Sequence, residues 1–215
     1  MIQVLIADDH AILRRGLKEI LMRELEGAVC GEAKDATETL SCIEHGDWDL
    51  VILDITMPGR SGLEVLRDLK TARPKLPVLV LSMHPEDQYA RRLLKAGASG
   101  YMNKEGVPED LVKAVRKVLA GGRYVSPALA EQLAADLSHD GGQPIHEVLS
   151  DREFEVLQFI GNGKDSHAIA KQLNLSVKTV DTHRTHLKAK LNLSSGTELI
   201  CYAARWVETQ TARDG

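Results

Sequence analysis

The hydrophobic positions in the first part of the chain fall into five short runs. These runs are IQVLIA (2–7), AVCGEA (28–33), LVILDI (50–55), PVLVLS (77–82) and SGYMNK (99–104). Each run is short enough to form one buried strand. Amphipathic stretches with helical spacing separate and follow them, at residues 10–24, 36–46, 62–72, 86–96 and 108–121. Five strands that alternate with five helices predict βαβ units, and therefore a parallel, doubly wound sheet covered on both faces.

The pattern changes after the two glycines at 121 and 122. The segment SPALAEQLAADLS predicts a short helix that starts at Ser126 and Pro127, and HDGGQP (139–144) predicts a tether. From Leu149 onward the spacing is wholly helical, with Ser150 and Glu153 forming a capping box at the first of four helices. We therefore expect an α/β domain over residues 1–121, a linker with a short helix over 122–147, and an all-α four-helix domain over 148–215.

The composition is that of an ordinary globular protein, with 43% hydrophobic and 27% charged residues among 215. No apolar stretch approaches the roughly 18 residues that span a bilayer. The first ten residues, MIQVLIADDH, lack a basic leader, so we expect no signal peptide, no membrane partner and a cytoplasmic location. The three cysteines, Cys30, Cys42 and Cys201, are widely spaced and match no zinc or disulfide pattern.

Polar side chains end or follow four of the five predicted strands. Asp8 and Asp9 follow the first, Asp54 ends the third, Ser82 ends the fourth and Lys104 ends the fifth. The carboxyl ends of parallel strands meet at one edge of a sheet, so these side chains should converge. Three neighbouring carboxylates repel one another and attract a divalent cation. Oxygen ligands without a nearby histidine or cysteine favour Mg²⁺.

A lysine and a hydroxyl beside such a metal suit a phosphoryl group, which an aspartate can accept as an acyl phosphate. Each residue also has a structural explanation when taken alone. Asp8 and Asp9 could cap the following helix, Asp54 could belong to a proline turn, and Lys104 could be a solvated surface lysine. Their joint placement at the strand ends favours a site over these separate explanations.

Four segments of this part of the chain resemble the receiver domain of two-component response regulators. They are LIADDH, LVILDITMPGRSGLEVL, VLVLSMH and KAGASGYMNKE, and they keep the order and spacing of that family over residues 1–121. The resemblance implies a flavodoxin-like fold in which a sensor histidine kinase phosphorylates Asp54. It also implies that Asp9 and Asp54 bind Mg²⁺ directly, that Asp8 acts through water, and that the Thr56 carbonyl completes the site.

The same resemblance assigns phosphoryl-binding or switching roles to three further positions. Ser82 and Lys104 would bind the phosphoryl oxygens, and Tyr101 holds the aromatic position that rotates inward on phosphorylation in this family. Ser82 can shift toward a new phosphoryl oxygen and leave space that Tyr101 fills. Without the resemblance, Tyr101 would be interpreted as half-buried packing.

The segment DSHAIAKQLNLSVKTVDTHRTHLKAKL has the length and turn of a helix-turn-helix. Apolar residues at helical spacing can bury an inner stripe, namely Ile169, Leu173, Val180, Leu187 and Leu191. Residues 164–190 hold six Lys or Arg against two Asp or Glu, although the whole chain has a net charge of −4. A local basic stretch is what phosphate contact requires, so the overall negative charge does not exclude DNA.

Ser176 is expected to cap the second helix of this motif, and a capped helix start can also bind phosphate. Basic residues able to reach phosphates are Lys178, Arg184, Lys188 and Lys190. Asp181, Thr182 and Thr185 share the face that can reach base edges, and Thr179 belongs to the same DNA-contacting set. An acid at position 181 suits a cytosine amino group and repels phosphate.

This C-terminal region resembles the LuxR-type DNA-binding domain of the NarL/FixJ class over residues 148–208. The resemblance rests on LSDREFEVLQFI, on IAKQLNLSVKTVDTHRTHLKAKL and on the last helix. It implies a sequence-specific transcriptional regulator that binds double-stranded promoter DNA, as a homodimer after phosphorylation. The dimer contact is expected at residues 197–206, on a helix whose apolar face has no other evident partner. RNA polymerase is a further candidate partner.

Two other functions fit parts of the sequence. Aspartate-phosphoryl hydrolases combine an Asp nucleophile, a lysine and Mg²⁺, but they place a second acid two residues after the nucleophile, where this chain has Thr56. We therefore expect no enzymatic turnover. An adaptor that acts only through protein partners stays open. His183 and His186 form an H-x-x-H pair without a third ligand, which favours packing or a phosphate hydrogen bond over metal binding.

Overall fold

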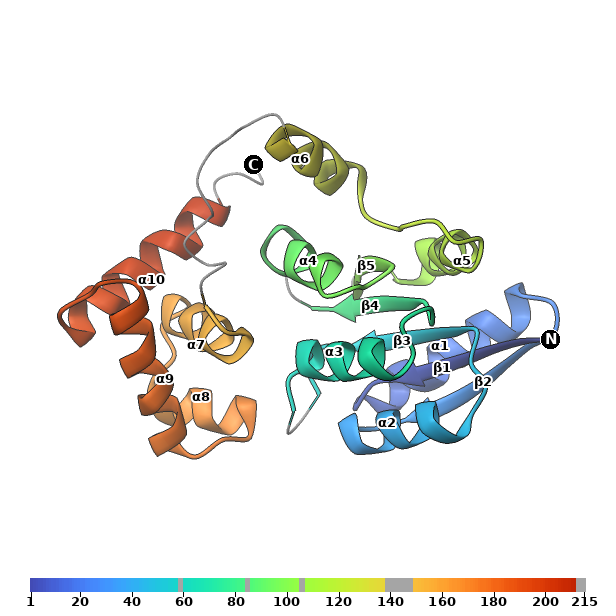
Figure 1. Cartoon of the computed structure of the whole chain (residues 1–215), viewed down its shortest axis with the longest axis horizontal. Coiled ribbons are helices and arrows are strands. Elements are labelled where there is room, and N and C mark those ends of the chain that lie inside the picture. Colours follow the sequence, from blue (N-terminus) through green and yellow to red (C-terminus); the bar gives the residue numbers. More distant parts are fainter. Residues whose placement is uncertain (58–59, 84–85, 105–106, 138–148, 212–215) are drawn as a thin grey trace. The chain divides into compact units, whose positions relative to one another are not determined.

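The computed structural model describes residues 1–57, 60–83, 86–104, 107–137 and 149–211 (Figure 1). The chain divides into two compact units, residues 1–140 and 141–215. The predicted tether at 139–144 lies outside the described residues. No described helix combines the length and the apolarity that crossing a bilayer demands.

The first unit is built on a five-stranded parallel sheet, as predicted. Its strands are β1 (Ile2–Ala7), β2 (Ala28–Ala33), β3 (Leu50–Asp54), β4 (Val78–Ser82) and β5 (Gly100–Asn103). Their order across the sheet is β2-β1-β3-β4-β5, with all neighbours parallel. This order is that of the flavodoxin-like fold. The register pairs Asp54 with Leu81 and Ser82 with Asn103, so the polar strand ends lie along the same edge.

Helices cover both faces of this sheet. They are α1 (Ala11–Glu24), α2 (Ala36–His45), α3 (Gly62–Ala72), α4 (Glu86–Lys95) and α5 (Val107–Leu119). Successive residues Val4, Leu5 and Ile6 point to opposite faces, and each is 0% exposed, so neither face of β1 meets solvent. Helices α1 and α5 pack against each other, and helices α2 and α3 pack against each other.

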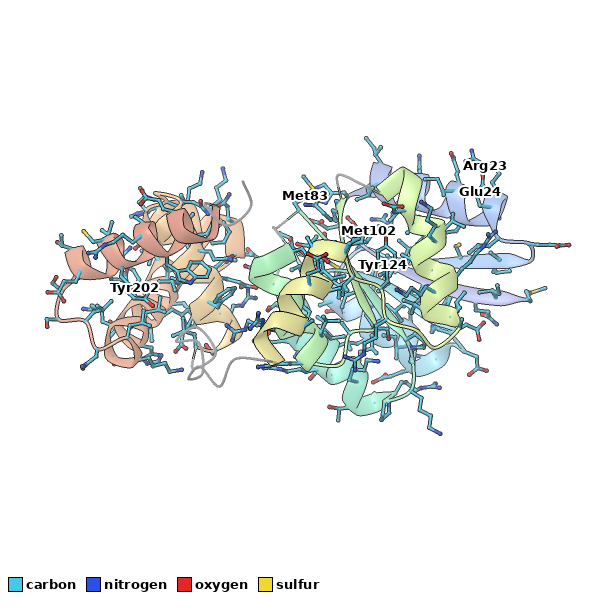
Figure 2. All side chains as sticks on the ribbon, turned by 90° about the horizontal axis from the view of Figure 1, so that it is seen from above. Arg23, Glu24, Met83, Met102, Tyr124 and Tyr202 are labelled. Atoms are coloured by element: carbon cyan, nitrogen blue, oxygen red, sulfur yellow. The ribbon has the colours of Figure 1, made fainter. Side chains whose placement is uncertain are left out.

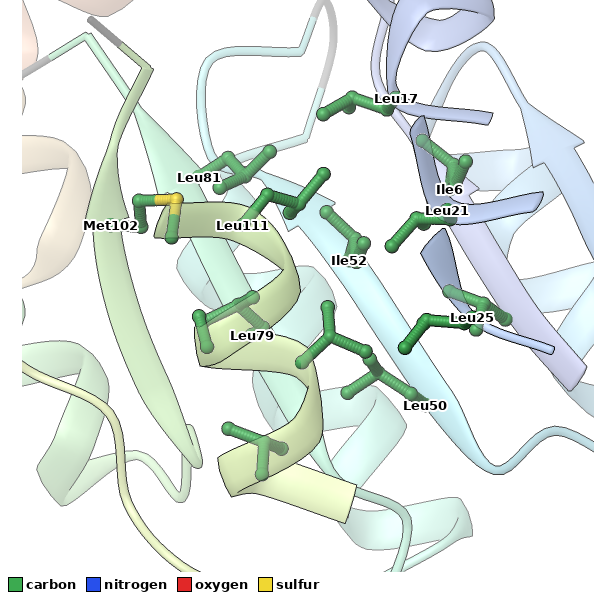
Figure 3. Packing of buried hydrophobic residues seen from close by; sticks show 14 of the residues in the cluster. Ile6, Leu17, Leu21, Leu25, Leu50, Ile52, Leu79, Leu81, Met102 and Leu111 are labelled. Atoms are coloured by element: carbon green, nitrogen blue, oxygen red, sulfur yellow. The ribbon is translucent and has the colours of Figure 1, made fainter. Parts of the chain in front are cut away.

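The main core cluster lies between the sheet and the pair α1 and α5 (Figure 3). Leu17 and Leu21 from α1 and Leu111 from α5 meet Ile6 and Ile52 of the sheet in this cluster. Burying one such side chain contributes about 1.5–3 kcal/mol relative to leaving it exposed. The core thereby fixes the strands whose ends carry the polar residues.

Element ends differ from the predictions by one or two residues. The first helix begins at Ala11 rather than at residue 10, and β3 ends at Asp54 rather than at Ile55. The fifth helix ends at Leu119, two residues before the predicted end. Gly121 has a φ of +82°, a left-handed conformation that a right-handed helix does not contain.

A short helix, α6 (Pro127–Leu137), follows in the linker, as predicted. Ser126 caps it, because its Oγ accepts a hydrogen bond from the Leu129 N–H at 3.1 Å. Leu129 is only 2% exposed, so the first turn of this helix is anchored by packing as well as by the cap.

The second unit consists of four helices, which confirms the all-α prediction. They are α7 (Asp151–Gly161), α8 (Ser166–Leu173), α9 (Val177–Lys190) and α10 (Gly196–Thr211). The predicted capping box is present, with Ser150 Oγ bound by the Glu153 N–H and the Glu153 carboxylate bound by the Ser150 N–H. Asn174 ends α8 in the left-handed region at φ 53° and ψ 46°, which makes the sharp turn into α9.

The inner stripe of the helix-turn-helix is buried largely as expected. Ile169, Val180 and Leu187 are 0% exposed and Leu191 is 8% exposed, whereas Leu173 is half-buried. α7 packs against both α9 and α10, and α8 packs against α9. Phe154 of α7 meets Trp206 of α10 edge to face, with ring centroids 5.4 Å apart.

Candidate functional site

Asp54 stands at the carboxyl end of β3 and is 1% exposed. Lys104 Nζ donates a hydrogen bond to its Oδ2 at 2.6 Å, and the Thr56 N–H donates to its Oδ1 at 2.9 Å. Each carboxylate oxygen therefore has a donor, and one of the two donors carries a full positive charge. A buried carboxylate needs such partners, because leaving it unpaired in the interior costs several kcal/mol.

Lys104 joins two acids that lie far apart in the sequence. Its Nζ is 2.6 Å from Asp54 Oδ2 and 2.8 Å from Asp8 Oδ2. The three side chains are 4% exposed for Lys104, 0% for Asp54 and 2% for Asp8. The structure thus brings together the ends of β1, β3 and β5, and Lys104 is not a solvated surface lysine.

Burial raises the pKa of Asp54 above its usual value. The Lys104 ammonium and the Thr56 N–H favour the ionised carboxylate and offset part of that rise, whereas the nearby Asp8 carboxylate adds to it. The competing influences show why the site depends on positive charge: each carboxylate is held in the interior only with a cation close by.

The helix-capping explanation for Asp8 and Asp9 does not hold. The N-cap of α1 is His10, whose side chain makes no capping hydrogen bond within the described chain. Asp8 Oδ1 instead accepts the His10 N–H at 2.7 Å, a bond that lies before the first helical residue. The two acids therefore face the strand ends rather than the first turn of the helix.

The acids also meet the requirements of a cation site. Asp8, Asp9, His10 and Asp54 each offer a ligand atom, and these atoms all lie within 4.8 Å of one another. Asp8 Oδ2 and Asp9 Oδ1 are buried; each has a nitrogen at 2.8 Å, Lys104 Nζ and His10 Nδ1 respectively, but neither accepts a well-oriented hydrogen bond from a described residue. Buried carboxylate oxygens with spare acceptor capacity are ligands that Mg²⁺ prefers, so the residues fit this ion.

The expectation that no histidine lies near these acids is wrong. His10 Nδ1 is 2.8 Å from Asp9 Oδ1 and 3.2 Å from Asp8 Oδ1, although its side chain is 66% exposed. The sequence pattern does not indicate His10, because this residue lies after the end of β1, next to the start of α1. The donor set still consists mainly of oxygens, which keeps the preference for Mg²⁺.

Ser82 and Tyr101 lie on the two strands beyond Asp54. Ser82 ends β4 and is 0% exposed, and Tyr101 of β5 is also 0% exposed. The interpretation of Tyr101 as half-buried is therefore wrong, because its ring is fully enclosed. The backbone N–H of Tyr101 donates to the Tyr124 carbonyl at 2.8 Å. Tyr124 lies in a segment after α5 for which the sequence pattern predicted no contact with the sheet.

The exposed face of α9 carries most of the predicted DNA-contacting residues. Lys178, Asp181, Thr182 and Thr185 are exposed, and Thr179, Arg184 and Lys188 are half-exposed. Ser176 caps this helix as predicted, because its Oγ accepts the Thr179 N–H at 3.0 Å. The Thr179 hydroxyl lies 2.7 Å from the same Oγ and so takes part in the cap.

Hydrogen bonds orient three of these side chains. Thr182 Oγ1 donates to the Lys178 carbonyl at 2.9 Å, and Thr185 Oγ1 donates to the Asp181 carbonyl at 3.0 Å. Asp181 Oδ1 accepts a hydrogen bond from Ser166 Oγ at 2.9 Å, which links α9 to the start of α8. This last pair could not be inferred from the sequence, because its members are 15 residues apart on different helices.

Among the residues predicted to contact phosphates, Lys190 has an ion pair with another helix. Its Nζ donates to Glu153 Oε2 at 2.7 Å and thereby ties the end of α9 to α7. Burial raises the pKa of Glu153, but the hydrogen bonds from Lys190 and from Ser150 outweigh burial and leave the pKa below its usual value. Lys190 therefore takes part in a structural ion pair, and its phosphate contact stays a prediction.

The two histidines of the H-x-x-H pair have different surroundings: His186 is exposed, with Nδ1 3.6 Å from Glu153 Oε1. His183 is half-buried, and its Nδ1 is buried without a hydrogen-bond partner among the described residues. Burial lowers the pKa of His183, Glu153 opposes the change, and His186 and Arg152 add to it. Among the described residues, neither histidine belongs to a cluster of three metal-ligating groups.

Helix α10 carries a shallow hollow on its outer side. The hollow has a volume of about 600 Å³ and is lined by Leu193, Thr197, Glu198, Cys201, Tyr202, Arg205 and Trp206. Cys201 is exposed within it, as a free thiol. An apolar hollow on an exposed helix is a surface suited to contact with another molecule.

Comparison with known families assigns both units. Residues 4–116 match the response regulator receiver domain, and residues 147–203 match the bacterial regulatory proteins of the luxR family. The chain therefore belongs to the two-component response regulators that join a receiver domain to a LuxR-type DNA-binding domain, a class of transcription regulators and not of enzymes.

Individual relatives match along nearly the whole chain. Response regulator GacA of Pseudomonas aeruginosa is 38% identical over 210 residues, which cover 95% of this chain and 96% of GacA. The oxygen regulatory protein NreC of Staphylococcus carnosus is 35% identical and covers 94% of this chain and 97% of NreC.

Solved structures of the regulator RcsB share the fold. RcsB from Salmonella enterica serovar Typhimurium, bound to promoter rprA with the phosphomimetic BeF₃⁻, matches with a TM-score of 0.63 and 30% identity, over 95% of this chain and 99% of that one. Another RcsB structure, from Salmonella typhimurium and described in terms of conformational dynamism for DNA interaction, matches with a TM-score of 0.66 and 28% identity. The match covers 95% of this chain and 97% of that one.

Proposed function

We propose that a sensor histidine kinase phosphorylates this regulator on Asp54, and that phosphorylation favours a dimer bound to promoter DNA. The observation that carries this proposal is the buried Asp54 carboxylate, which has Lys104 at 2.6 Å and stands beside a second acid, Asp8. Such a carboxylate at the active edge of a parallel sheet is equipped to accept a phosphoryl group.

The chemistry assigns one task to each residue. One oxygen of Asp54 forms a bond to phosphorus while the P–N bond of the kinase's phosphohistidine breaks, and the departing imidazole takes a proton from solvent. Lys104 then pairs with a phosphoryl oxygen, and the Ser82 hydroxyl donates to another. Tyr101 moves into the space that Ser82 leaves. The group adds about −1.5 to −2 charge, which is why these donors respond to it.

The acids supply the cation site of the same reaction. Asp9 and Asp54 would hold Mg²⁺ directly, Asp8 would act through water, and the Thr56 carbonyl would complete the coordination. When bound, Mg²⁺ offsets the negative charge of the carboxylates and of the phosphoryl oxygens. The buried Asp8 Oδ2 and Asp9 Oδ1, which keep free acceptor capacity beside Lys104 and His10, support this assignment.

In the C-terminal unit, α9 is the proposed recognition helix. Its phosphate contacts would come from Lys178, Thr179, Arg184 and Lys188, and its base contacts from Asp181, Thr182 and Thr185. The hydrogen bond from Ser166 to Asp181 supports the base-reading role of the acid, because a fixed carboxylate discriminates better than a mobile one. The RcsB complexes with DNA show that a relative with this fold binds promoters.

A second copy of the chain is the proposed partner for the hollow on α10, at residues 197–206. Paired subunits would read two half-sites about 10 bp apart. The proposed boundaries are 1–121 for the receiver, 122–147 for the linker and 148–215 for the DNA-binding domain. The proposed location is the cytoplasm, where RNA polymerase would be a further partner.

The experiment compares the wild type with two aspartate variants. With acetyl phosphate and Mg²⁺, the wild type and the control Asp47→Asn, an exposed acid, should gain one phosphoryl group by intact mass, whereas Asp54→Asn should gain none. Full labelling of Asp54→Asn would place the acceptor elsewhere. Gel shifts then test the output: a phosphorylated protein without sequence-selective DNA binding would favour the adaptor function.

A further inference from the structure

The segment that follows α5, residues 123–126, lies along the edge of the sheet, and we call it the strap. The Tyr124 N–H donates to the Ser99 carbonyl at 3.0 Å, and the Tyr101 N–H donates to the Tyr124 carbonyl at 2.8 Å. Gly100 and Tyr124 form an isolated parallel bridge. The strap therefore extends the sheet beyond β5 by one residue pair.

Side chains hold the strap in this position. The Tyr124 ring, labelled in Figure 2, packs against the core cluster. Lys117 Nζ lies 5.9 Å from the ring centroid. A glycine is needed opposite it, because a Cβ at position 100 would lie 2.7 Å from the Tyr124 carbonyl oxygen. The close fit indicates a built contact rather than a loop that merely passes the sheet.

The far end of the strap is tied to a different element. The Ser126 N–H donates to Glu86 Oε1 at 2.9 Å, and Glu86 is the first residue of α4. Ser126 is also the residue whose Oγ caps α6. The hydrogen bond to Glu86 therefore holds the start of the linker helix in place. A carboxylate acceptor makes it stronger than a bond between neutral groups.

Both anchors stand next to residues that meet the phosphoryl group. Glu86 comes four residues after Ser82, and Tyr101 comes three residues before Lys104. A phosphoryl group on Asp54 would pull the Ser82 hydroxyl and the Lys104 ammonium toward its oxygens. The two chain segments that hold the strap are therefore the segments that such a pull displaces.

We propose that the strap couples the phosphoryl site to the linker: the Glu86–Ser126 bond holds the start of α6 in the unphosphorylated chain and opens when Asp54 is phosphorylated. This inference rests on the proposed phosphorylation of Asp54. Opening frees the N-terminal turn of α6, the helix that leads to the DNA-binding domain. Glu86 is a positioning residue in this scheme and touches no phosphoryl oxygen.

Hydrogen exchange of the full-length protein tests the proposal. With acetyl phosphate and Mg²⁺, amides of residues 124–130 in the wild type should exchange about tenfold faster or more, the effect expected when a charge-assisted hydrogen bond opens. Glu86→Ala should show this fast exchange without phosphorylation, and phosphorylation should add little. Glu86→Gln keeps an accepting oxygen at the same place but removes its charge, so its exchange should lie between the two and closer to the wild type.

Each outcome bears on one proposal only. Intact mass reports phosphorylation independently of exchange, so an unlabelled wild type would overturn the proposed function. A fully labelled wild type with unchanged exchange at 124–130 would overturn the strap mechanism alone. The same holds if Glu86→Ala and Glu86→Gln exchange alike. Gel shifts give the second readout, in which unphosphorylated Glu86→Ala should bind promoter DNA more tightly than Glu86→Gln.

Discussion

Replacement of Lys104 by alanine should destabilise the receiver domain more than any surface lysine can. The side chain is 4% exposed and lies 2.6 Å from Asp54 and 2.8 Å from Asp8. Its removal leaves two carboxylates in the interior without their common cation. They then repel each other as well as losing their hydrogen bonds.

The magnitude follows from the burial of this group. Breaking a buried ion pair by removal of one partner costs about 3–5 kcal/mol, because the remaining charge is left uncompensated. Here one lysine serves two acids, so we expect Lys104→Ala to reach the upper part of that range in the absence of divalent cations. Mg²⁺ should reduce this loss in the free energy of unfolding, since a cation held by Asp8, Asp9 and Asp54 replaces part of the missing positive charge.

Urea denaturation measures this free energy of unfolding. Trp48 reports on the receiver domain if Trp206, the other tryptophan, is replaced by phenylalanine in all variants. The matched control is Lys113→Ala, whose lysine is 74% exposed and pairs with Asp110 at 2.9 Å. An exposed pair contributes about 0–1 kcal/mol. If both variants lose the same stability in EDTA, Lys104 does not compensate the buried acids and our reasoning is refuted.

Three further predictions concern recognition, pH and packing. Thr182→Ala should change sequence preference in binding-site selection, whereas Lys188→Ala should weaken all sequences and reduce the salt slope by about 1. Burial lowers the pKa of His183, so below the usual histidine pKa the unfolded state binds a proton that the folded state does not, and urea denaturation of the DNA-binding domain should show stability falling from pH 7 to pH 5. Gly62→Ala should lower the free energy of unfolding by about 1–3 kcal/mol or more, because the new Cβ would overlap the Ile55 backbone.

Each of these predictions has a contradicting result. Equal effects of the two α9 variants on preference and on affinity would invalidate the division into base and phosphate contacts. A pH dependence that persists in His183→Leu would assign it to another group. For the glycine, the control is Gly196→Ala, since a Cβ there meets nothing within 4 Å; comparable losses for both would argue against steric overlap.

The acidic site was predictable because parallel topology converts distant sequence positions into neighbours. Once five strands alternate with helices, the residues at their carboxyl ends must share an edge, which is how Asp8, Asp54 and Lys104 could be grouped from the sequence. The caps at Ser150 and Ser176 were predictable for a local reason, since their partners lie three residues away.

The strap and the Ser166–Asp181 bond could not be predicted in this way. Each depends on a few contacts between elements that lie apart in the sequence, and such contacts leave no periodicity in the sequence. Tyr124 lies in a stretch too short to be recognised as a strand, and it pairs with β5 through one bridge only. The ion pair between Lys190 and Glu153 could not be predicted for the same reason, because its two members lie on different helices. The charge of Lys190 alone indicated only a phosphate contact.

The occupied oxygens of Asp54 have a consequence for how faithfully a signal is relayed. In the resting chain, Lys104 and the Thr56 N–H each hold one oxygen, at 2.6 and 2.9 Å. On the proposed function, a small phosphodonor that arrives by diffusion would meet oxygens that already accept hydrogen bonds, whereas a bound kinase would stay in place while these bonds rearrange. In that scheme, Lys104 would first slow phosphorylation by small donors and would afterwards pair with the phosphoryl group, so the kinase would be favoured over metabolites as the phosphodonor.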